Sequence, residues 1–332
     1  MPRPNFVLLL ATTLQLALSV HCQLPLNLDS KGSRVPKGFS KLLFHDGFGD
    51  RPAGSLPSPK KWTVDLGTSY PGGPPQWGTQ EVQTYTSQRA NIHVTPRKTL
   101  LITPVRAPNG SWTSARIETN AEWDFGCAPG QRLRVEFKTK LGGRPKAERD
   151  NNNNNNNNIT RAELSGIWPA GWLLGSKFRG NFQNWPGIGE IDIMESLNGE
   201  PRNFHVAHCG INPGGPCNEP SGVSNVSESV RRGVWHTYSW EVDRRAGGND
   251  SESMTWAIDG VPKWTLRQSD LGDAGAWQVL AAEKKMVLFN VAVGGAFADA
   301  IAGFKTPTNE TVGGRGAAME VDYVAVYASR VM

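Results

Sequence analysis

Residues 189–196 read Gly-Glu-Ile-Asp-Ile-Met-Glu-Ser, so three carboxylates fall within six positions. The first acids alternate with isoleucines at a period of two, as in a strand with one apolar and one polar face. Regular alternation would place Glu195 on the apolar face, where an unpaired carboxylate is very costly. One extra residue, a β-bulge near Ile193 or Met194, returns Glu195 to the face of the other two acids.

This bulge predicts a specific spacing between two glutamates. The Cα atoms of Glu190 and Glu195 then lie about 13 Å apart, at roughly 3.3 Å per residue. Two side chains that lean toward each other leave their carboxyls roughly 5 Å apart, as in a retaining glycosidase. Crowded like charges raise at least one pKa, which a general acid requires. The alternative is a strand whose acids merely face water, but no lysine is interleaved with them and tryptophans lie nearby.

Residues 1–22 have the features of a secretory signal peptide. Arg3 supplies the positive start, and a mostly apolar run too short for a membrane span follows from Phe6 to Val20. Cleavage after Ser19 and cleavage after Cys22 are both compatible with the sequence. The C-terminus lacks the hydrophobic tail of a lipid anchor. We therefore expect an exported protein that is soluble and located outside the cell or in the cell wall.

Composition favours a large all-β domain. The chain has 37 glycines, 23 prolines and 12 tryptophans, and it has no long helical pattern. We expect an N-terminal arm over 23–40 and one catalytic domain over 41–329. The net charge of +5 comes from scattered residues rather than a basic block, which argues against a nucleic-acid partner.

Short strand candidates recur between turn signals, as in an antiparallel sandwich. They include residues 90–94, 99–104, 114–119, 131–139, 203–209, 234–242, 254–258, 286–293 and 319–327. Residues 143–165 interrupt this pattern with a charged segment and eight consecutive asparagines at 151–158. Such a run cannot bury apolar surface, so we expect a disordered loop there. Residues 269–276 are typical of a loop or a single helical turn.

Two cysteines flank a turn-rich loop. Cys209 and Cys217 enclose Gly-Ile-Asn-Pro-Gly-Gly-Pro, and in an oxidising compartment we expect them to pair. The alternative is a metal site, because His205 and His208 lie beside the first cysteine, but the spacing matches no zinc pattern.

Other features agree with export. Cys127 is either a buried free thiol or the partner of Cys22. Glycosylation sequons, which indicate surface loops, occur at Asn109, Asn158, Asn225, Asn249 and Asn309.

Several tryptophans lie near the acidic stretch, and sugar rings bind to aromatic side chains through their apolar faces. Trp77, Trp168, Trp172 and Trp185 all occur in or beside Gly/Pro-rich segments. Core packing is the alternative for each one. Trp168 and Trp172 are four positions apart, so they share a face in a strand or a helical turn.

These motifs together resemble family 16 of the glycoside hydrolases, laminarinase-like branch, as found in secreted fungal enzymes. The resemblance spans about Leu42 to Tyr327, and Gly189 to Glu195 looks like the family's E-x-D-x-x-E signature. Supporting matches in the family's order are Trp-Pro-Ala-Gly-Trp at 168–172, Trp-Pro at 185–186, Asn-Val-Ala-Val-Gly-Gly at 290–295 and Val-Asp-Tyr-Val-Ala-Val-Tyr at 321–327. The resemblance implies a β-jelly-roll sandwich of two antiparallel sheets with a concave substrate cleft.

The resemblance also implies roles for residues at the acidic stretch. Glu190 matches the nucleophile, Glu195 the acid/base, and Asp192 a helper that bonds to the nucleophile. Trp185 matches an aromatic residue near the sugar that is cleaved. His208 matches a histidine next to the acid/base on the adjoining strand, with His205 as a near competitor.

Residues further along the cleft follow from the same resemblance. Glu81 and Arg116 match residues that line the glycone side, with Trp77 beside them, although Gln80 stands where the family usually has asparagine. The remaining expected substrate-binding residues are Trp168, Trp172 and Asn290. Asp322 matches an acid that helps to hold a structural calcium in some relatives, and a buried, hydrogen-bonded aspartate is the alternative. No cofactor is expected to be required.

The bulged six-residue signature resembles that of laminarinases and of several galactan-cleaving relatives. It implies endo-hydrolysis of β-1,3-glucan, and also of mixed β-1,3/1,4-glucan, with retention of configuration. Transglycosylation, a β-1,3-galactan substrate and a glucan-binding protein without catalysis are the alternatives. We expect a monomer whose partner is the polysaccharide, without nucleic acid or membrane.

Overall fold

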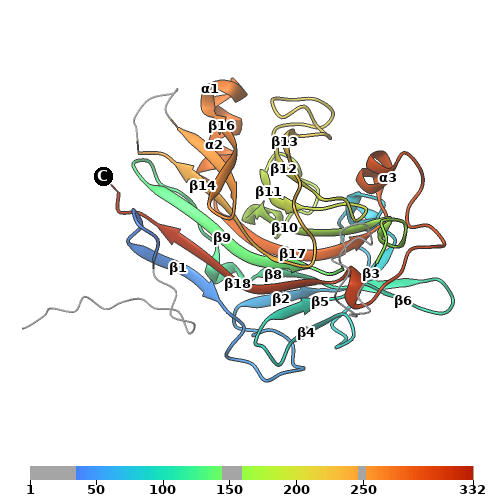
Figure 1. The fold of residues 1–332 in the computed structure, drawn as a ribbon. Coiled ribbons are helices and arrows are strands. Elements are labelled where there is room, and N and C mark those ends of the chain that lie inside the picture. Colours follow the sequence, from blue (N-terminus) through green and yellow to red (C-terminus); the bar gives the residue numbers. More distant parts are fainter. Residues whose placement is uncertain (1–34, 144–158, 246–251, 332) are drawn as a thin grey trace, which may run out of the picture.

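The computed structural model describes residues 35–143, 159–245 and 252–331, and these form two large antiparallel sheets packed face to face (Figure 1). The expected signal peptide and the asparagine run at 151–158 lie outside the described residues. Most of the strand candidates are confirmed, with ends shifted by a few positions.

The eight-stranded sheet has the order β16-β15-β14-β9-β18-β5-β4, and β1 pairs with β18 beside this path. Its strands are β1 (Lys41–Asp46), β4 (Ile92–Val94), β5 (Leu100–Ile102), β9 (Arg132–Leu141), β14 (Trp235–Asp243), β15 (Ser253–Ile258), β16 (Val261–Arg267) and β18 (Met319–Ala328). We call this sheet A.

The seven-stranded sheet, sheet B, has the order β13-β12-β11-β10-β17-β8-β2. Its strands are β2 (Trp62–Asp65), β8 (Arg116–Thr119), β10 (Ile167–Gly175), β11 (Glu190–Glu195), β12 (Arg202–His208), β13 (Val223–Glu228) and β17 (Lys285–Val293). A small third sheet joins β3 (Gln83–Tyr85), β7 (Trp112–Ser114) and β6 (Val105–Arg106).

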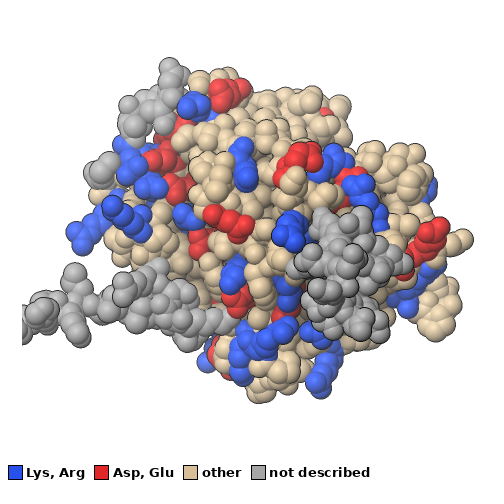
Figure 2. Space-filling model, viewed as in Figure 1, with Lys and Arg blue, Asp and Glu red and all other residues tan. Residues whose placement is uncertain are grey.

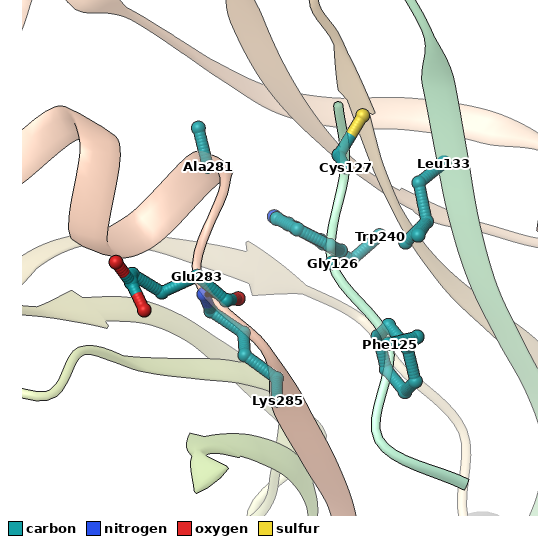
Figure 3. Close-up of a pocket in the computed structure, with 8 residues that line it drawn as sticks. All are labelled: Phe125, Gly126, Cys127, Leu133, Trp240, Ala281, Glu283 and Lys285. Atoms are coloured by element: carbon teal, nitrogen blue, oxygen red, sulfur yellow. Dashed lines mark hydrogen bonds between the residues drawn. The ribbon is translucent and has the colours of Figure 1, made fainter. Parts of the chain in front are cut away.

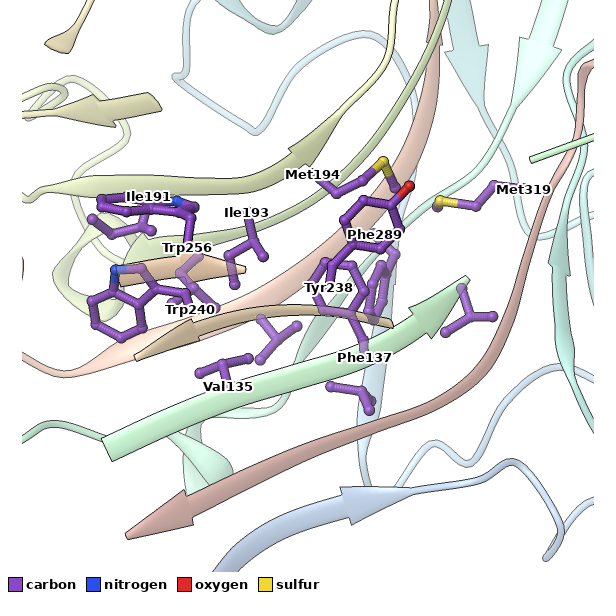
Figure 4. Packing of buried hydrophobic residues seen from close by; sticks show 14 of the residues in the cluster. Val135, Phe137, Ile191, Ile193, Met194, Tyr238, Trp240, Trp256, Phe289 and Met319 are labelled. Atoms are coloured by element: carbon purple, nitrogen blue, oxygen red, sulfur yellow. The ribbon is translucent and has the colours of Figure 1, made fainter. Parts of the chain in front are cut away.

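The core fills the space between sheets A and B. In β9, buried and partly exposed residues alternate strictly, because one face packs on sheet B and the other faces outward. Every residue of β17 is buried, so loops and helices must also cover its outer face. Figure 4 shows the two layers meeting: Ile191 and Ile193 of sheet B point toward Trp240 and Trp256 of sheet A.

In the described residues, three short α-helices lie at the rims of the sandwich. The helices α1 (Gln268–Leu271) and α2 (Ala274–Ala281) replace the single turn expected at 269–276, and α3 (Ala296–Ala302) was not predicted. In Figure 1, α3 stands at the opposite end of the molecule from α1 and α2. Short 3-10 helices are η1 (Pro75–Gly78), η2 (Ala121–Trp123), η4 (Ala162–Leu164), η5 (Ser176–Phe178) and η6 (Arg315–Ala317). Within the three described ranges, no helix is long and apolar enough to cross a membrane.

The prediction of disorder over 143–165 is wrong at its C-terminal part. Residues 159–165 are structured, and the side chains of Ile159 and Leu164 are buried in the main core. Apolar residues that follow the asparagine run therefore rejoin the sandwich directly. Asn158 and Asn249 lie outside the described residues, while Asn109 and Asn309 are exposed outside helices and strands.

Asn225 is exposed on the edge strand β13 rather than in a loop. Figure 2 shows lysine and arginine interspersed with acidic side chains over the visible face, in keeping with a scattered positive charge.

Candidate active site

The three acids lie on β11, and the predicted bulge is confirmed. Asp192 and Glu195 pair with Val206 and Phe204 of β12, so three steps on β11 match two steps on its neighbour. The same shift occurs against β10. Ile193 and Met194 are both fully buried, so the extra residue is accommodated in the core and Glu195 returns to the outer face.

Buried hydrogen bonds hold this bulge in place. The carbonyl of Ile193 lies 3.0 Å from Nδ1 of His205, whose Nε2 lies 2.9 Å from the Ser227 hydroxyl. Burial lowers the pKa of His205 to about 4, so the ring is neutral at pH 7. The indole of Trp256 donates to the carbonyl of Asp192 across 2.9 Å. His205 therefore supports β11 from the core and does not compete with His208 for a place among the acids.

Strand register gathers the predicted site residues on the outer face of sheet B. Directly paired residues share a face, which follows from the pleat. Glu190 faces His208, and Asp192 faces Trp172. The side chains that share this face are Arg116, Trp168, Trp172, Glu190, Asp192, Glu195, Phe204, Val206, His208 and Asn290.

Glu195 is surrounded by aromatic residues. The indole N–H of Trp168 donates to its Oε1 across 2.9 Å. Phe297 of α3 packs edge-on against both Trp168 and Phe204, at ring-centre distances of 5.6 Å and 5.3 Å. Burial raises the pKa of Glu195 to about 7, against the lowering effect of the Trp168 hydrogen bond. At neutral pH this carboxyl can therefore hold a proton and release it.

Glu190 has a different environment. Its Oε2 accepts a hydrogen bond from the indole of Trp185 at 3.1 Å. Burial raises the pKa of Glu190, while the charges of His208 and Arg116 and the Trp185 hydrogen bond lower it. These opposing influences favour an ionised carboxylate more than the apolar surroundings of Glu195 do.

Asp192 lies between the two glutamates and is nearly fully buried. Burial and the charges of Glu190, Glu195 and Glu219 raise its pKa well above the usual range. The raised pKa favours the protonated form of Asp192, whose hydroxyl can donate a hydrogen bond. Its Oδ2 has no hydrogen-bond partner among the described residues.

The predicted place of His208 is wrong in one respect. It was expected next to the acid/base, but register places it opposite Glu190, whereas Phe204 lies opposite Glu195. The bulge brings Glu195 one residue closer to His208 along β12 than regular pairing would, but Phe204 still lies opposite it. The Nε2 atom of His208 lies 3.5 Å from Asp192 Oδ2, and its Nδ1 lies 2.7 Å from Glu219 Oε2.

Glu219 is a site residue that the sequence did not reveal. It follows the Cys209–Cys217 disulfide, which is confirmed, and its side chain is completely buried. Its other oxygen accepts a hydrogen bond from the backbone N–H of Cys209 at 2.7 Å. The only signal was its position two residues after a paired cysteine, in a loop anchored beside His208.

Trp172 and Trp77 enclose a buried cation. The guanidinium of Arg116 lies 4.6 Å from the Trp77 ring centre and 4.9 Å from that of Trp172. Its Nε donates to Asp65 Oδ2 at 3.0 Å, and Tyr70 donates to the same oxygen. Burial raises the pKa of Asp65 to about 6, against the lowering effect of Arg116. The rings of Trp77 and Trp172 therefore both form cation–π contacts with the Arg116 guanidinium.

Two residues expected to bind substrate, Asn290 and Glu81, are nearly fully buried and bonded to neighbouring side chains. Asn290 accepts a hydrogen bond from the Trp172 indole and donates to the Tyr85 hydroxyl. Glu81 accepts bonds from Tyr85 and Gln83, with only 5% of its surface exposed. Both hold neighbouring side chains in place, because an unpaired polar group at these depths would be costly.

Trp168 and Trp172 share the outer face as predicted, and neither belongs to the core between the sheets. Trp168 packs under α3 in a small cluster with Phe204. Trp172, like Trp185 and Phe182, packs against another cluster, which contains Leu174 and Leu288.

One group of side chains has atoms close enough together to bind a metal ion. Single oxygen or nitrogen atoms of Glu190, Asp192 and His208 lie within 4.8 Å of one another. The Nδ1 atom of His208 is already bonded to Glu219, and Trp185 occupies one oxygen of Glu190, so we interpret the group as a proton-sharing cluster. Asp322, for which the resemblance implied either a calcium ligand or a buried aspartate, is partly exposed, and Lys138 Nζ lies 3.5 Å from its carboxylate.

Cys127 is a buried free thiol among the described residues, and Cys22 lies outside them. It lines a small space between β9, β14 and the start of β17, with Phe125 and Lys285 (Figure 3). Burial raises the pKa of this thiol to about 12, so it is unreactive at neutral pH.

The outer face of sheet B thus combines two glutamates of different character with a buried aspartic acid of raised pKa and a rim of indoles. The raised pKa of Glu195 suits a proton donor, and His208, Arg116 and Trp185 favour the ionised form of Glu190, as general acid–nucleophile catalysis at an acetal carbon requires. This combination is that of an enzyme that cleaves glycosidic bonds.

Comparisons with known proteins agree with this class. The family model "XgeA-like, catalytic GH16 domain" matches residues 159–250. An endo-1,3-beta-glucanase from Streptomyces sioyaensis is 39% identical, with a TM-score of 0.78 over 90% of this chain and 99% of that one. The chain belongs to glycoside hydrolase family 16, and its two packed sheets form the β-jelly-roll of that family.

Two more distant relatives also match most of this chain. A beta-glucanase of Rhodothermus marinus is 28% identical over 257 residues, which cover 73% of this chain and 72% of that protein. A mutant of a non-specific endo-beta-1,3(4)-glucanase is 23% identical, with a TM-score of 0.60 over 88% of this chain and 96% of that one. That crystal structure holds 1,3-beta-D-cellobiosyl-glucose at its active site.

Proposed function

We propose that the protein is a secreted, retaining endo-hydrolase of β-1,3-glucan, with mixed β-1,3/1,4-glucan as a further substrate. The observation that carries this proposal is the bulge in β11, which brings Glu195 back to the face of Glu190. The 39% identity to an endo-1,3-beta-glucanase over 90% of the chain supports the choice of glucan. The substrate is the expected partner of a monomeric chain.

The first step forms a covalent glycosyl–enzyme. A carboxylate oxygen of Glu190 attacks the anomeric carbon while Glu195 transfers its proton to the leaving glycosidic oxygen. The pKa of about 7 suits Glu195 to this task, because the carboxyl is still protonated in mildly acidic solution. Asp192 shares the face of both glutamates and is the helper, which we expect to form a hydrogen bond with Glu190.

The second step releases the sugar. Glu195, now ionised, removes a proton from water, the water oxygen bonds to the anomeric carbon, and Glu190 leaves as a carboxylate. Two displacements on the same carbon retain its configuration. Trp185 holds Glu190 during both steps, and the rings of Trp77 and Trp172 offer apolar surfaces to neighbouring sugars.

Replacement of the nucleophile tests the assignment. Glu190→Gln should abolish release of reducing sugar from laminarin, while the melting temperature stays within a few degrees of wild type. Glu228→Gln, at an exposed glutamate of β13, is the matched control and should remain active. Substantial turnover by the Glu190→Gln protein would refute the role.

The substrate class is tested with laminarin, lichenan, barley β-glucan, xyloglucan and β-1,3-galactan, with the products sized by chromatography. Shorter products from laminarin are expected. Products longer than the substrate would identify a transglycosylase, preference for galactan would identify a galactanase, and binding without product would identify a recognition module.

Export follows as a separate part of the proposal. It is supported by the apolar N-terminal segment, the sequons and the Cys209–Cys217 disulfide. N-terminal sequencing of the mature protein from the culture medium should give a start after Ser19 or Cys22. A full-length chain retained inside the cell would contradict export.

A further inference from the structure

A buried carboxylate lies behind the acids of the active site. Glu219 is outside both large sheets, and its side chain has no exposed surface. Its Oε1 accepts the backbone N–H of Cys209, and its Oε2 lies 2.7 Å from Nδ1 of His208. Because a carboxylate accepts hydrogen bonds, Nδ1 of His208 carries the hydrogen.

The opposite edge of the His208 ring faces the catalytic acids. Its Nε2 lies 3.5 Å from Asp192 Oδ2, an oxygen that has no hydrogen-bond partner among the described residues. Glu190 is paired with His208 in the strand register. The His208 ring also lies 5.5 Å from the ring of Trp185, whose indole donates to Glu190.

We propose that Glu219 is a positioning residue, which acts on the catalytic acids through His208. It fixes the orientation of the imidazole and holds a second proton on it, so that a positive charge faces Glu190 and Asp192. This inference rests on the proposed function of Glu190, Asp192 and Glu195, and it assigns a further role to Glu219.

The surrounding charges support this role. Around His208 lie four carboxyls, those of Glu219, Glu190, Asp192 and Glu195, and the other cation that acts on Glu190 is Arg116. Burial lowers the pKa of His208, but the hydrogen bond to Glu219 and the charge of Glu190 raise it above its usual value. In turn, His208 is the largest influence that lowers the pKa of Glu190.

A purely structural role for Glu219 is the alternative, since its bond to Cys209 also closes the loop. The chain offers a matched control elsewhere. Asp259 contacts Nδ1 of His236 at 2.6 Å and accepts the backbone N–H of Thr237 at 2.8 Å. This pair repeats the carboxylate–histidine arrangement on sheet A, away from the acids.

The experiment compares Glu219→Gln with Asp259→Asn. Histidine side chains labelled with ¹⁵N report the pKa of His208 by NMR without any turnover, and kcat/KM on laminarin is measured against pH. In Glu219→Gln the pKa of His208 should fall. The charge of Glu219 also raises the pKa of Glu190 directly, but this influence is weaker than the lowering by His208, so the acidic limb of kcat/KM should still move up by about 0.5 to 1 pH unit. Activity below that limb then drops about threefold to tenfold. Asp259→Asn should leave the profile unchanged.

A second variant removes ambiguity if Glu219→Gln folds poorly. His208→Gln keeps Glu219 and should shift the acidic limb in the same direction. Addition of Glu219→Gln to that protein should then produce no further upward shift, because loss of the direct charge of Glu219 on Glu190 moves the limb downward. A lower kcat with an unmoved limb in both single variants, or an unchanged His208 pKa, would overturn the inference. A wild-type protein inactive on all glucans would instead refute the proposed function, and the NMR result would still decide the His208–Glu219 link.

Discussion

The indole N–H of Trp168 donates a hydrogen bond to Oε1 of Glu195 across 2.9 Å. This bond links the neighbouring strands β10 and β11 of sheet B at the proposed acid/base. The bond stabilises the charged carboxylate and opposes the effect of burial, which raises the pKa of Glu195. One indole therefore adjusts the pH range over which the acid keeps its proton.

Loss of this indole should shift the basic limb of the pH profile. In Trp168→Phe the pKa of Glu195 should rise further above about 7, so the acid stays protonated to higher pH. The basic limb of kcat should move up by about half a unit to one unit. Trp172→Phe is the matched control, because its indole donates to Asn290 instead. A basic limb that moves equally in both proteins would contradict the prediction.

His205 should make the protein sensitive to acid. Its folded pKa of about 4 lies below the usual value of 6.5, so the unfolded chain takes up the proton first as the pH falls. This costs the native state about 2 kcal/mol of unfolding free energy between pH 7 and pH 5.

Urea unfolding of wild type and His205→Gln at both pH values checks this effect. Glutamine can still donate to the Ile193 carbonyl but cannot titrate. The three acids of β11 titrate with the opposite sign in both proteins, so their effect cancels in the comparison. The variant should lose less stability than wild type on acidification, and equal losses would count against the prediction.

Removal of the Cys209–Cys217 disulfide should lower both stability and activity. The closed loop is short, so the expected loss is about 2 to 3 kcal/mol of unfolding free energy. Activity should fall as well, because Glu219 follows this loop and holds His208. A Cys209→Ser/Cys217→Ser protein should unfold at lower urea and turn over laminarin more slowly.

Reducing agent serves as the control for this prediction. It should slow the wild type and Cys127→Ala alike, since Cys127 is a free thiol. The double serine variant should not respond. Loss of stability with full activity would show that the loop does not hold the site.

Arg116 should govern substrate affinity more than turnover. Arg116→Lys keeps the charge but loses the planar group that lies under Trp77 and Trp172. KM for laminarin oligosaccharides should rise about fivefold or more, which corresponds to about 1 kcal/mol of stacking, with a smaller change in kcat. Arg179→Lys, in the neighbouring ion pair with Glu118, is the control, and an equal rise in its KM would argue against a role of the rings.

Alternation and turn chemistry were sufficient to predict two antiparallel sheets and the bulge at Ile193 and Met194. These features depend on local rules, namely the period of two and the cost of a buried carboxylate. The position of His208 depends on the pairing of β11 with β12, which a single strand does not encode. Glu219 was missed for a related reason, because a loop brings it to the histidine.

The burial of individual side chains could not be predicted from the sequence either. Asn290 and Glu81 match a family pattern, but their neighbours Tyr85 and Trp172 cover them. The helix α3 was also missed, since its alanines gave no periodic pattern. Its Phe297 nevertheless closes the apolar wall beside Glu195.

The bulge in β11 also bears on how such a gene can change. Deletion of the codon for Ile193 or for Met194 would restore the regular alternation of apolar and acidic residues. All three acids would still project from the same face of the strand. The two glutamates would then sit one residue closer, by about 3.3 Å along the strand. A single one-codon deletion therefore separates two spacings of the glutamate pair. No intermediate is needed in which one of the acids points into the core.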